Sequence, residues 1–253
     1  MLDQSRVTAA FDRAEHYSGY ADIQRLIAGE LASRIAQLNL PDAARVLEIG
    51  CGTGFLTREL LDRKIGHDWL ITDKAPAMVE RCRSAVGEEP GREFAVLDGE
   101  YGLGMIEGRF DIICASMAMQ WFDDLSNAVQ RLIARLGSGG HLVFNTLASG
   151  TFSEWRDAHE QCGLEAGAIV FPEANALIAL LRSFSPEILT VERHVEHHDN
   201  ARKFLDRLKC IGAATPRPSH VPLAPGDLKR VMAAFDRAGA QTTYEVVTCH
   251  IAG

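Results

Sequence analysis

The stretch Arg45-Val46-Leu47-Glu48-Ile49-Gly50-Cys51-Gly52-Thr53-Gly54 decides the fold, because it joins a short apolar run to a glycine-rich turn. Residues 46–49 predict a strand, and residues 55–63 predict the helix that follows it. The glycines let the backbone turn sharply and approach a ligand closely. We therefore expect a ligand at the end of this strand; a tight turn without a ligand is the alternative.

The spacing of charged residues around the turn narrows the class of ligand. A dinucleotide fingerprint has a glycine at its sixth position, where this chain has Phe55, and no Lys-Ser/Thr pair follows to make a P-loop. Glu48 precedes the turn, and a carboxylate there suits cationic groups better than a pyrophosphate. Asp73 ends the next apolar run and is placed to accept two ribose hydroxyls. Together these residues favour S-adenosylmethionine, which carries a sulfonium and an ammonium.

Alternating apolar runs predict an α/β fold with a mostly parallel, Rossmann-like sheet and helices on both faces. We expect the last two strands to extend the sheet as an antiparallel pair, and residues 137–140 to form a glycine-rich turn. The expected strands are 45–49, 69–72, 93–97, 110–115, 141–146, 189–197 and 242–251, and the expected helices are 21–38, 55–63, 76–86, 125–136, 153–162, 174–181, 200–211 and 227–238.

We expect a single domain over residues 1–253, built as several consecutive parts. These are a helical lid (1–40), a cofactor-binding core (41–150), a substrate cap that includes one sheet strand (151–226), and a closing helix and strand (227–253). Ligands in sheets of this kind lie at the carboxyl ends of the strands. Gly50, Asp73, Asp98 and Ser116 all follow expected strands, so the sequence predicts that they converge on one site.

Composition excludes several classes of protein. A formal net charge of −8 argues against a nucleic-acid partner, which needs a basic surface. No apolar run approaches the length of a membrane span, and charged residues interrupt any secretory leader. The six cysteines form no C-x-x-C pair, so we expect reduced thiols and a cytoplasmic location. We expect no metal: His194, His197 and His198 lie in or beside one expected strand without a completing acid or cysteine.

These motifs resemble class I S-adenosylmethionine-dependent methyltransferases and, more narrowly, the malonyl-acyl-carrier-protein O-methyltransferases of biotin synthesis. The closer resemblance lies in residues 10–17 (AFDRAEHY), 116–121 (SMAMQW), 147–154 (LASGTFSE) and 208–213 (LKCIGA). It runs over most of the chain. Gly137-Ser138 stands where the wider superfamily often has Lys-Pro, and Lys74 stands where an apolar residue is common. The loop at 216–225 also departs from the family pattern.

The resemblance implies methyl transfer from S-adenosylmethionine to the free carboxylate of a malonyl thioester, carried by acyl carrier protein or coenzyme A. The products would be S-adenosylhomocysteine and a methyl ester that fatty-acid enzymes elongate toward pimelate. A carboxylate is ionised near pH 7, so the reaction needs orientation and exclusion of water rather than a general base. Other acceptors, such as another small acid or a quinone precursor, stay open. A non-catalytic regulator that binds the cofactor is a further alternative, and a nicotinamide dehydrogenase is a more distant one.

The resemblance also implies roles for individual residues. Tyr17 and Gln120 are the catalytic candidates, although a Tyr at this position could instead pack the leading helix. Expected cofactor-binding residues are His16, Glu48, Gly50, Cys51, Gly52, Gly54, Asp73, Lys74, Met78, Asp98, Gly99, Glu100, Ser116 and Met117.

Positively charged residues suggest where the substrate is held. A docking surface for substrate or carrier is expected at Trp121, Arg202, Lys203, Arg207 and Lys209, although cations on one helix are often only a solvated face. A substrate carboxylate also suggests an arginine in the pocket, because the guanidinium matches a carboxylate in shape. The candidates are Arg6, Arg13 and Arg156.

Overall fold

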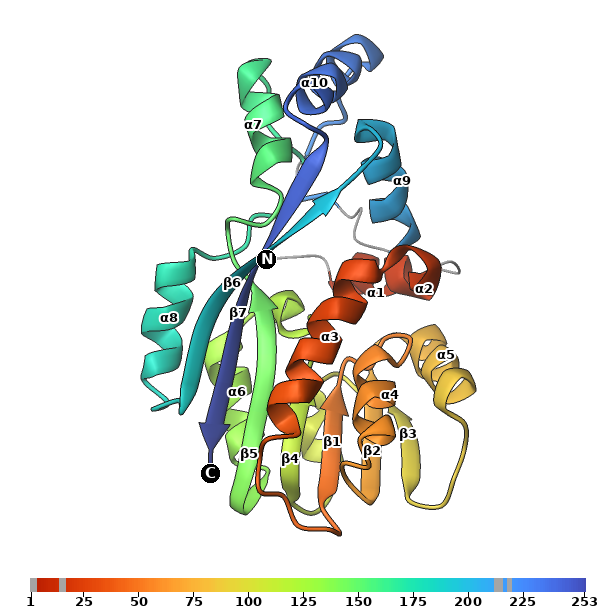
Figure 1. The fold of residues 1–253 in the computed structure, drawn as a ribbon, viewed down its shortest axis with the longest axis vertical. Helices are drawn as coiled ribbons and strands as arrows, with labels where there is room; N and C mark the ends of the chain where they lie inside the picture. Colours follow the sequence, from red (N-terminus) through yellow and green to blue (C-terminus); the bar gives the residue numbers. More distant parts are fainter. Residues whose placement is uncertain (1–3, 14–16, 212–215, 218–219) are drawn as a thin grey trace.

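The computed structural model describes residues 4–13, 17–211, 216–217 and 220–253 and shows one mixed sheet (Figure 1). Within these residues the sheet has seven strands in the order β3-β2-β1-β4-β5-β7-β6. Strands β1 to β5 are parallel, and β7 runs antiparallel to both β5 and β6. The mostly parallel sheet and its antiparallel closing pair are confirmed. The strands are β1 (Arg45–Ile49), β2 (Asp68–Asp73), β3 (Arg92–Val96), β4 (Phe110–Ala115), β5 (Leu136–Leu147), β6 (Ile188–His197) and β7 (Gln241–Ala252).

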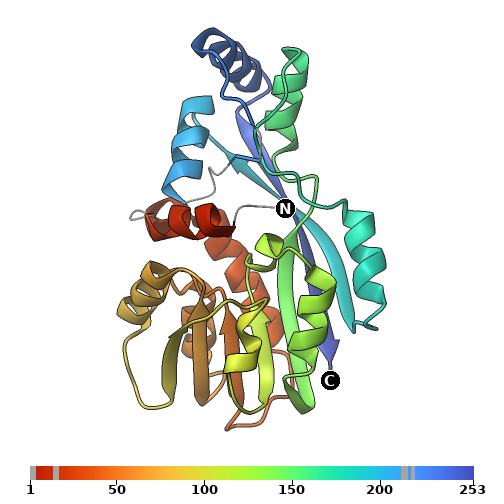
Figure 2. The same cartoon turned by 180° about the vertical axis from the view of Figure 1, so that it is seen from behind.

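Helices cover both faces of the sheet because side chains alternate between the faces along each strand. On β1, Val46 packs under α3 (Asp22–Ile35) and α4 (Phe55–Asp62). The next residue, Leu47, packs on the opposite face, where α6 (Leu125–Ile133) and α8 (Ala174–Arg182) lie. Helix α5 (Pro76–Val86) begins at a proline, which is tolerated in a first turn, and covers β2 and β3. Figure 2 shows the α6 side of the molecule.

A cap stands beyond the carboxyl ends of the parallel strands. The first residues of β7, Gln241–Glu245, pair with β6 alone, because β5 pairs only from Val246 onward. This two-stranded extension carries α7 (Ser153–Gln161), α9 (Ala201–Cys210) and α10 (Pro225–Arg237) (Figure 1). Buried aromatic side chains join the extension to these helices; they include Phe152, Trp155, Phe204, Phe235 and Tyr244.

The sequence boundaries of the cap differ from this arrangement in two helices. Helix α8 lies inside the range expected for the cap, yet its Leu177 and Leu181 are buried against the sheet. Helix α10 lies in the expected closing segment, yet its Phe235 is buried in the core of the cap. Neither assignment can be made from amphipathicity, because an apolar stripe does not specify which surface covers it.

One local expectation was wrong, and several short elements were not expected. Residues 137–140 do not form a separate turn, because β5 begins at Leu136 and contains them. The pairing with β4 moves from Phe110↔Leu136 to Ile112↔His141, so the glycines form an irregularity within the strand. The residue pattern gave no bounds for a helix in the first half of the expected helical lid, where α1 (Gln4–Asp12) has only one buried side chain, Val7. The short elements α2 (Tyr17–Tyr20), η1 (Gly102–Met105) and η2 (Met119–Trp121) were likewise not expected.

None of the helices in the described part of the chain is long and apolar enough to cross a lipid bilayer.

Candidate active site

The glycine-rich turn after β1 has one glycine that faces open space and two that serve packing. Gly50, Gly52 and Gly54 all have positive φ, which disfavours any other residue. A Cβ on Gly50 would lie 2.4 Å from Cβ of Ala118, and one on Gly54 would lie 3.0 Å from Sγ of Cys82. A Cβ on Gly52 would meet nothing within 4 Å. Gly52 therefore leaves room for a ligand, while Gly54 begins α4 and does not line the cavity.

Asp73 and the turn are held together by hydrogen bonds at the end of β2. Its Oδ2 accepts from the backbone N–H of Gly52 (2.9 Å), and its Oδ1 accepts from that of Ala75 (2.8 Å). Burial raises the pKa of Asp73, and the two backbone donors partly oppose this shift. Each carboxylate oxygen has a further lone pair, so both oxygens can still accept a ligand hydroxyl.

Asp98 and Lys74 form a second charged pair beside Asp73. The Nζ of Lys74 lies 2.7 Å from Oδ2 of Asp98, whose Oδ1 accepts from the backbone N–H groups of Glu100 and Tyr101. Burial raises the pKa of Asp98, but these hydrogen bonds outweigh burial and hold the pKa below its usual value. Asp98 is therefore ionised near pH 7, and Lys74 neutralises it.

Glu48 is nearly inaccessible to solvent, with 1% of its surface exposed. Its Oε2 accepts a 2.6 Å hydrogen bond from the hydroxyl of Thr57 on α4. Burial raises the pKa of Glu48 to about 7, although the bond from Thr57 lowers it and the charge of Asp73 raises it further. This carboxyl is therefore partly protonated near pH 7.

Glu100 organises the loop that follows β4. Its carboxylate accepts from the backbone N–H groups of Asp123 (2.9 Å) and Asp124 (2.7 Å), and only 3% of the residue is exposed. Asp124 in turn caps α6 by accepting from the N–H of Asn127. Glu100 borders the cavity, but its oxygens already position this loop.

The segment after β4 presents several of the expected site residues together. Met117 has a φ of 51°, an uncommon value for a residue with a side chain, and its N–H donates to Oδ1 of Asn145 (2.6 Å). The Nε2 of Gln120 donates to the carbonyl of Met117 (2.5 Å), which fixes the amide against the strand end. Ser116 and Trp121 flank these residues, and both border a cavity.

Helix α1 contacts this segment and contributes lining residues to the same cavity. The Nε2 of Gln4 donates to the carbonyl of Trp121 (2.6 Å), and the Phe11 and Trp121 rings meet edge to face with centroids 5.5 Å apart. At its other end, Asp12 accepts from the N–H of Ala77 on α5 (3.0 Å). A lid within residues 1–40 stays an expectation, and α1 lines the cavity with Gln4, Val7 and Phe11.

Two cavities meet at the carboxyl ends of the strands. The strand-end cavity lies between the glycine-rich turn, the end of β2 and α1; of the expected cofactor residues that are described, all but Gly54 line it. The cap cavity lies under α7, α9 and the 164–172 segment. The residues that line both cavities are Phe11, Tyr17, Gln24, Met117 and Trp121. A group bound in one cavity can therefore reach a group bound in the other. His16 lies outside the described residues.

Tyr17 occupies this junction as a protonated phenol. Its ring lies 6.2 Å from that of Phe55, between centroids. Burial raises the pKa of Tyr17, and the negative charge of Asp73 raises it further, so the hydroxyl keeps its proton at physiological pH. Tyr17 can donate a hydrogen bond into the junction, but it cannot serve as a ready base.

Gln24 is a junction residue that the sequence analysis missed. It lies on α3 between buried apolar residues, with 8% of its surface exposed, and its Oε1 has no hydrogen-bond partner. Two further buried oxygens without a partner also belong to cavity-lining residues, Thr53 Oγ1 and Gln120 Oε1. The sequence did contain a signal for Gln24, since it is a polar residue within the apolar stripe of 21–38. A buried polar group normally has a hydrogen-bond partner, so a polar residue in such a stripe can indicate a ligand.

The cations expected to form a docking surface do not form one patch. Arg207 makes ion pairs with Asp22 (2.7 Å) and Glu196 (2.9 Å) and is mostly buried. Arg202 lies near Asp206 (3.3 Å), whereas Lys203 is exposed. Lys209 differs from all of these because it lines the cap cavity.

None of the arginines proposed as carboxylate ligands lines the described wall of the cap cavity. Arg156 is held elsewhere, because its guanidinium donates to the carbonyls of Ser149 and Thr151. Arg13 is exposed at the end of α1. The three arginines therefore stay predictions as carboxylate ligands, with no place in the described lining of the cap cavity.

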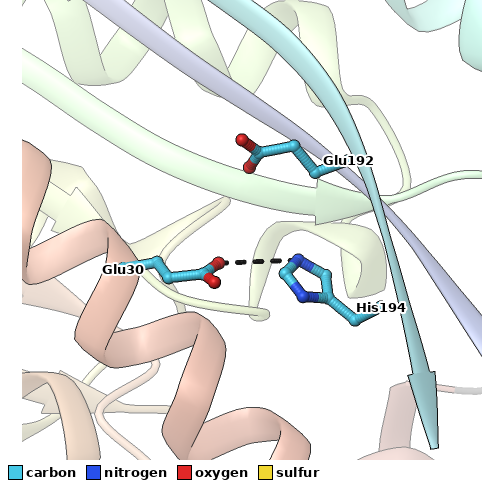
Figure 3. A group of neighbouring side chains, drawn as sticks. All are labelled: Glu30, Glu192 and His194. Atoms are coloured by element: carbon cyan, nitrogen blue, oxygen red, sulfur yellow. Dashed lines mark ion pairs between the residues drawn. The ribbon is translucent and has the colours of Figure 1, made fainter.

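The histidines of β6 do not gather with one another. Instead, His194 lies beside Glu30 of α3 and Glu192, and their potential ligand atoms all lie within 4.8 Å (Figure 3). Nε2 of His194 is 3.5 Å from Oε2 of Glu30, while Glu192 pairs with Arg34 at 2.6 Å. The guanidinium already neutralises one carboxylate, so this cluster ties α3 to β6 as an ion-pair network.

The charges around the strand-end cavity favour a cationic ligand. The carboxyl groups of Glu48, Asp73, Asp98 and Glu100 border it, against the single ammonium of Lys74 among the described lining residues. A pyrophosphate would meet repulsion in such a cavity, whereas a positively charged ligand is attracted. The structure therefore agrees with the ligand class inferred from Glu48 and the turn.

Comparison with known proteins points to one group of enzymes. A family model described as a methyltransferase domain matches residues 21–191. A Biotin biosynthesis bifunctional protein BioCD of Bordetella avium is 42% identical over 95% of this chain, which spans half of that protein's length. A Malonyl-[acyl-carrier protein] O-methyltransferase of Magnetococcus marinus is 38% identical, with 96% of this chain and 90% of the relative aligned.

The fold also has solved counterparts. A crystal structure from Bacillus halodurans, described as that of a methyltransferase, matches with a TM-score of 0.61 and 12% identity. The match covers 88% of this chain and 98% of the other. At this identity the match concerns the fold alone.

Proposed function

The chain belongs to the methyltransferases and, within them, to the malonyl-[acyl-carrier protein] O-methyltransferase family, and from this premise we propose its reaction. It transfers a methyl group from S-adenosylmethionine to the free carboxylate of a malonyl thioester. The thioester is carried by acyl carrier protein or coenzyme A. The product is the methyl ester that enters biotin synthesis, and S-adenosylhomocysteine is released.

The observation that carries this proposal is the junction of the two cavities at Tyr17, Met117 and Trp121. A transfer reaction requires donor and acceptor to meet in a space closed to water, and these residues border both compartments. The acceptor side is mainly apolar and aromatic, with Phe152, Trp155 and Phe204 among its lining residues. Such a lining removes water from a carboxylate and so increases its reactivity.

The space at Gly52 and the acidic lining of the strand-end cavity support S-adenosylmethionine as its ligand. Gly52 leaves space where any other residue would fill the cavity, and the buried hydroxyl of Thr53 lacks a partner. Asp73 would accept the ribose hydroxyls, and Asp98 borders the same cavity at the neighbouring strand end. Glu48 lies near the expected position of the positive charges. When bound, this cofactor supplies an electrophilic methyl group on a positively charged sulfur.

The residues of the chain orient the acceptor rather than activate it. A carboxylate is already ionised near pH 7, so no base is required. Tyr17 stays protonated, and its hydroxyl would donate a hydrogen bond to one carboxylate oxygen. The other carboxylate oxygen would then be left to react. Gln120, fixed through Met117, would align the thioester. Orientation of this kind can supply roughly 7–11 kcal/mol of the barrier.

The carrier would approach along the outer face of α9. Acyl carrier proteins would have to present their thioester at the cap cavity, and Arg202 and Lys203 are exposed on α9 beside it. Because Arg207 is held in ion pairs, we place the docking contribution on Arg202 and Lys203. Such surface charges act mainly on the rate of encounter.

The decisive experiment measures transfer of labelled methyl from S-adenosylmethionine to malonyl-carrier protein, malonyl-coenzyme A and acetyl-carrier protein. We expect transfer to both malonyl thioesters and none to the acetyl thioester, which has no free carboxylate. Label on a small aromatic acid or a quinone precursor, but not on malonyl thioesters, would reassign the acceptor. Cofactor binding without transfer to any acceptor would support a regulator instead of an enzyme.

A further inference from the structure

The cap cavity contains one lysine or arginine among its described lining residues, Lys209. Most of the surrounding wall is apolar, with Phe152, Trp155, Phe171 and Phe204. No aspartate or glutamate lines the described wall. An anion that enters this space loses water and gains little from the aromatic rings, so its position depends on the nearest cation.

Among the described residues, Lys209 and Lys203 of α9 are both exposed and without an ion pair, but only Lys209 lines the cap cavity. Arg202 and Arg207 pair with aspartate or glutamate, whereas no carboxylate of the described residues lies within ion-pair distance of Lys209. This is notable in a protein with a net charge of −8, where acidic partners are abundant. An ammonium beside an apolar cavity is therefore free to bind an anionic ligand.

The position of Lys209 also relates it to the junction. It lies in the last turn of α9, and that end of the helix packs near α2, which begins with Tyr17 (Figures 1 and 2). Lys209 and Tyr17 line the same cavity. A carboxylate in this space can thus meet an ammonium on one side and a phenol hydroxyl on the other.

We propose that Lys209 binds the free carboxylate of the malonyl thioester and thereby selects malonyl over uncharged acyl groups. This inference rests on the proposed function, and it gives Lys209 a role inside the cavity in place of the docking role suggested by its sequence. It also accounts for product release, because the methyl ester carries no charge at that end. The attraction that holds the substrate is lost when the new O–C bond forms.

The test compares Lys209→Met with Lys209→Arg and with the control Lys229→Met. Methionine removes the charge but keeps an apolar stem beside Leu205 and Leu208 of the same helix. Lys229 on α10 is, like Lys209, an exposed lysine, but it lines neither cavity. Calorimetry with S-adenosylhomocysteine present measures the affinity for malonyl-coenzyme A, its methyl ester and acetyl-coenzyme A. Steady-state assays then give KM and kcat for malonyl-coenzyme A.

We expect Lys209→Met to bind malonyl-coenzyme A about ten- to a hundredfold more weakly, in line with the loss of a charge-assisted hydrogen bond. Affinity for the methyl ester and acetyl-coenzyme A should not change, KM should rise more than kcat falls, and Lys209→Arg should recover part of the loss. Unchanged affinity for malonyl-coenzyme A, or an equal loss for all three thioesters, would overturn the role of Lys209. A wild-type protein that neither binds nor methylates malonyl thioesters would instead overturn the proposed function itself.

Discussion

The backbone N–H of Gly52 donates a 2.9 Å hydrogen bond to Oδ2 of Asp73, which lies 21 residues further along the chain. This bond joins the turn after β1 to the end of β2, two parallel strands that pair residue by residue up to Ile49↔Thr72. The cofactor cavity is therefore built by the sheet register as much as by the glycine-rich turn. Its two sides can be tested separately.

Replacing Asp73 with Asn should weaken S-adenosylmethionine binding by about tenfold or more, because an amide has one acceptor oxygen and no charge. Calorimetric titration with S-adenosylhomocysteine measures the effect. Asp68→Asn is the matched control, because Asp68 lies at the other end of β2 and pairs with Arg45 on the surface. Equal affinity of the Asp73 variant and the wild type would place the ribose contact elsewhere.

Gly52→Ala should abolish cofactor binding while leaving the fold intact. The added methyl group enters the cavity, and the positive φ costs about 1–2 kcal/mol of stability. Gly163→Ala is the control, since Gly163 also has positive φ and open space around its Cβ position but lines neither cavity. Both variants should unfold at similar urea concentrations, and only Gly52→Ala should fail to bind. Normal binding by Gly52→Ala would show that this space is not part of the site.

Tyr17→Phe should lower kcat for a malonyl thioester by about tenfold while cofactor affinity stays within a factor of two or so, because it removes one hydrogen bond to the acceptor. Tyr20→Phe, an exposed tyrosine on the same short helix, is expected to behave as wild type. Kinetics at saturating S-adenosylmethionine separate the two effects. A Tyr17 variant with full turnover would assign this residue to packing.

Glu48 should make the ligand-free protein less stable as pH rises. Its pKa is about 7 in the folded state, above the usual value of 4.5, so folding is favoured while the group is protonated. The loss of stability from ionising Glu48 is absent below about pH 4 and grows as the pH rises toward 7. Above that pH it reaches up to about 3 kcal/mol. Glu48→Gln should therefore have a higher free energy of unfolding than the wild type, and this difference should be larger at pH 8 than at pH 5. Urea titration of both proteins at the two pH values measures it. A pH-independent difference between the two proteins would contradict this assignment.

The sequence was sufficient for the elements whose pattern is local. Strands 45–49 and 110–115 were placed with their observed bounds, because short apolar runs between turn residues leave little choice. The glycine-rich turn and the acid at the end of β2 also predicted a cofactor site there through their spacing alone, and a hydrogen bond joins the two in the structure. A helical lid was expected within residues 1–40, but the bounds of α1 were not predicted, because its contacts with Trp121 and Ala77 are long-range and leave only a weak apolar stripe.

The residues of the cap cavity could not be predicted, because they depend on contacts that the spacing of residues in the sequence does not show. Four cations on α9 look equivalent in sequence, yet Arg207 pairs with Asp22 and Glu196, and Lys209 borders a cavity. In the sequence, Gln24 is only one polar residue in an apolar helix. Its place at the junction of the two cavities follows from the packing of α3.

By itself, the sequence determined the α/β class, and it predicted the cofactor turn and its acidic partners, because these follow from local periodicity and backbone freedom. Only the tertiary structure decided which helices form the cap, how α1 packs against Trp121 and Ala77, and which charges remain unpaired. The physical reason is that burial and ion pairing are properties of surfaces brought together from distant parts of the chain. The sequence of an apolar stripe, or the presence of a lysine, does not specify which surface will contact it.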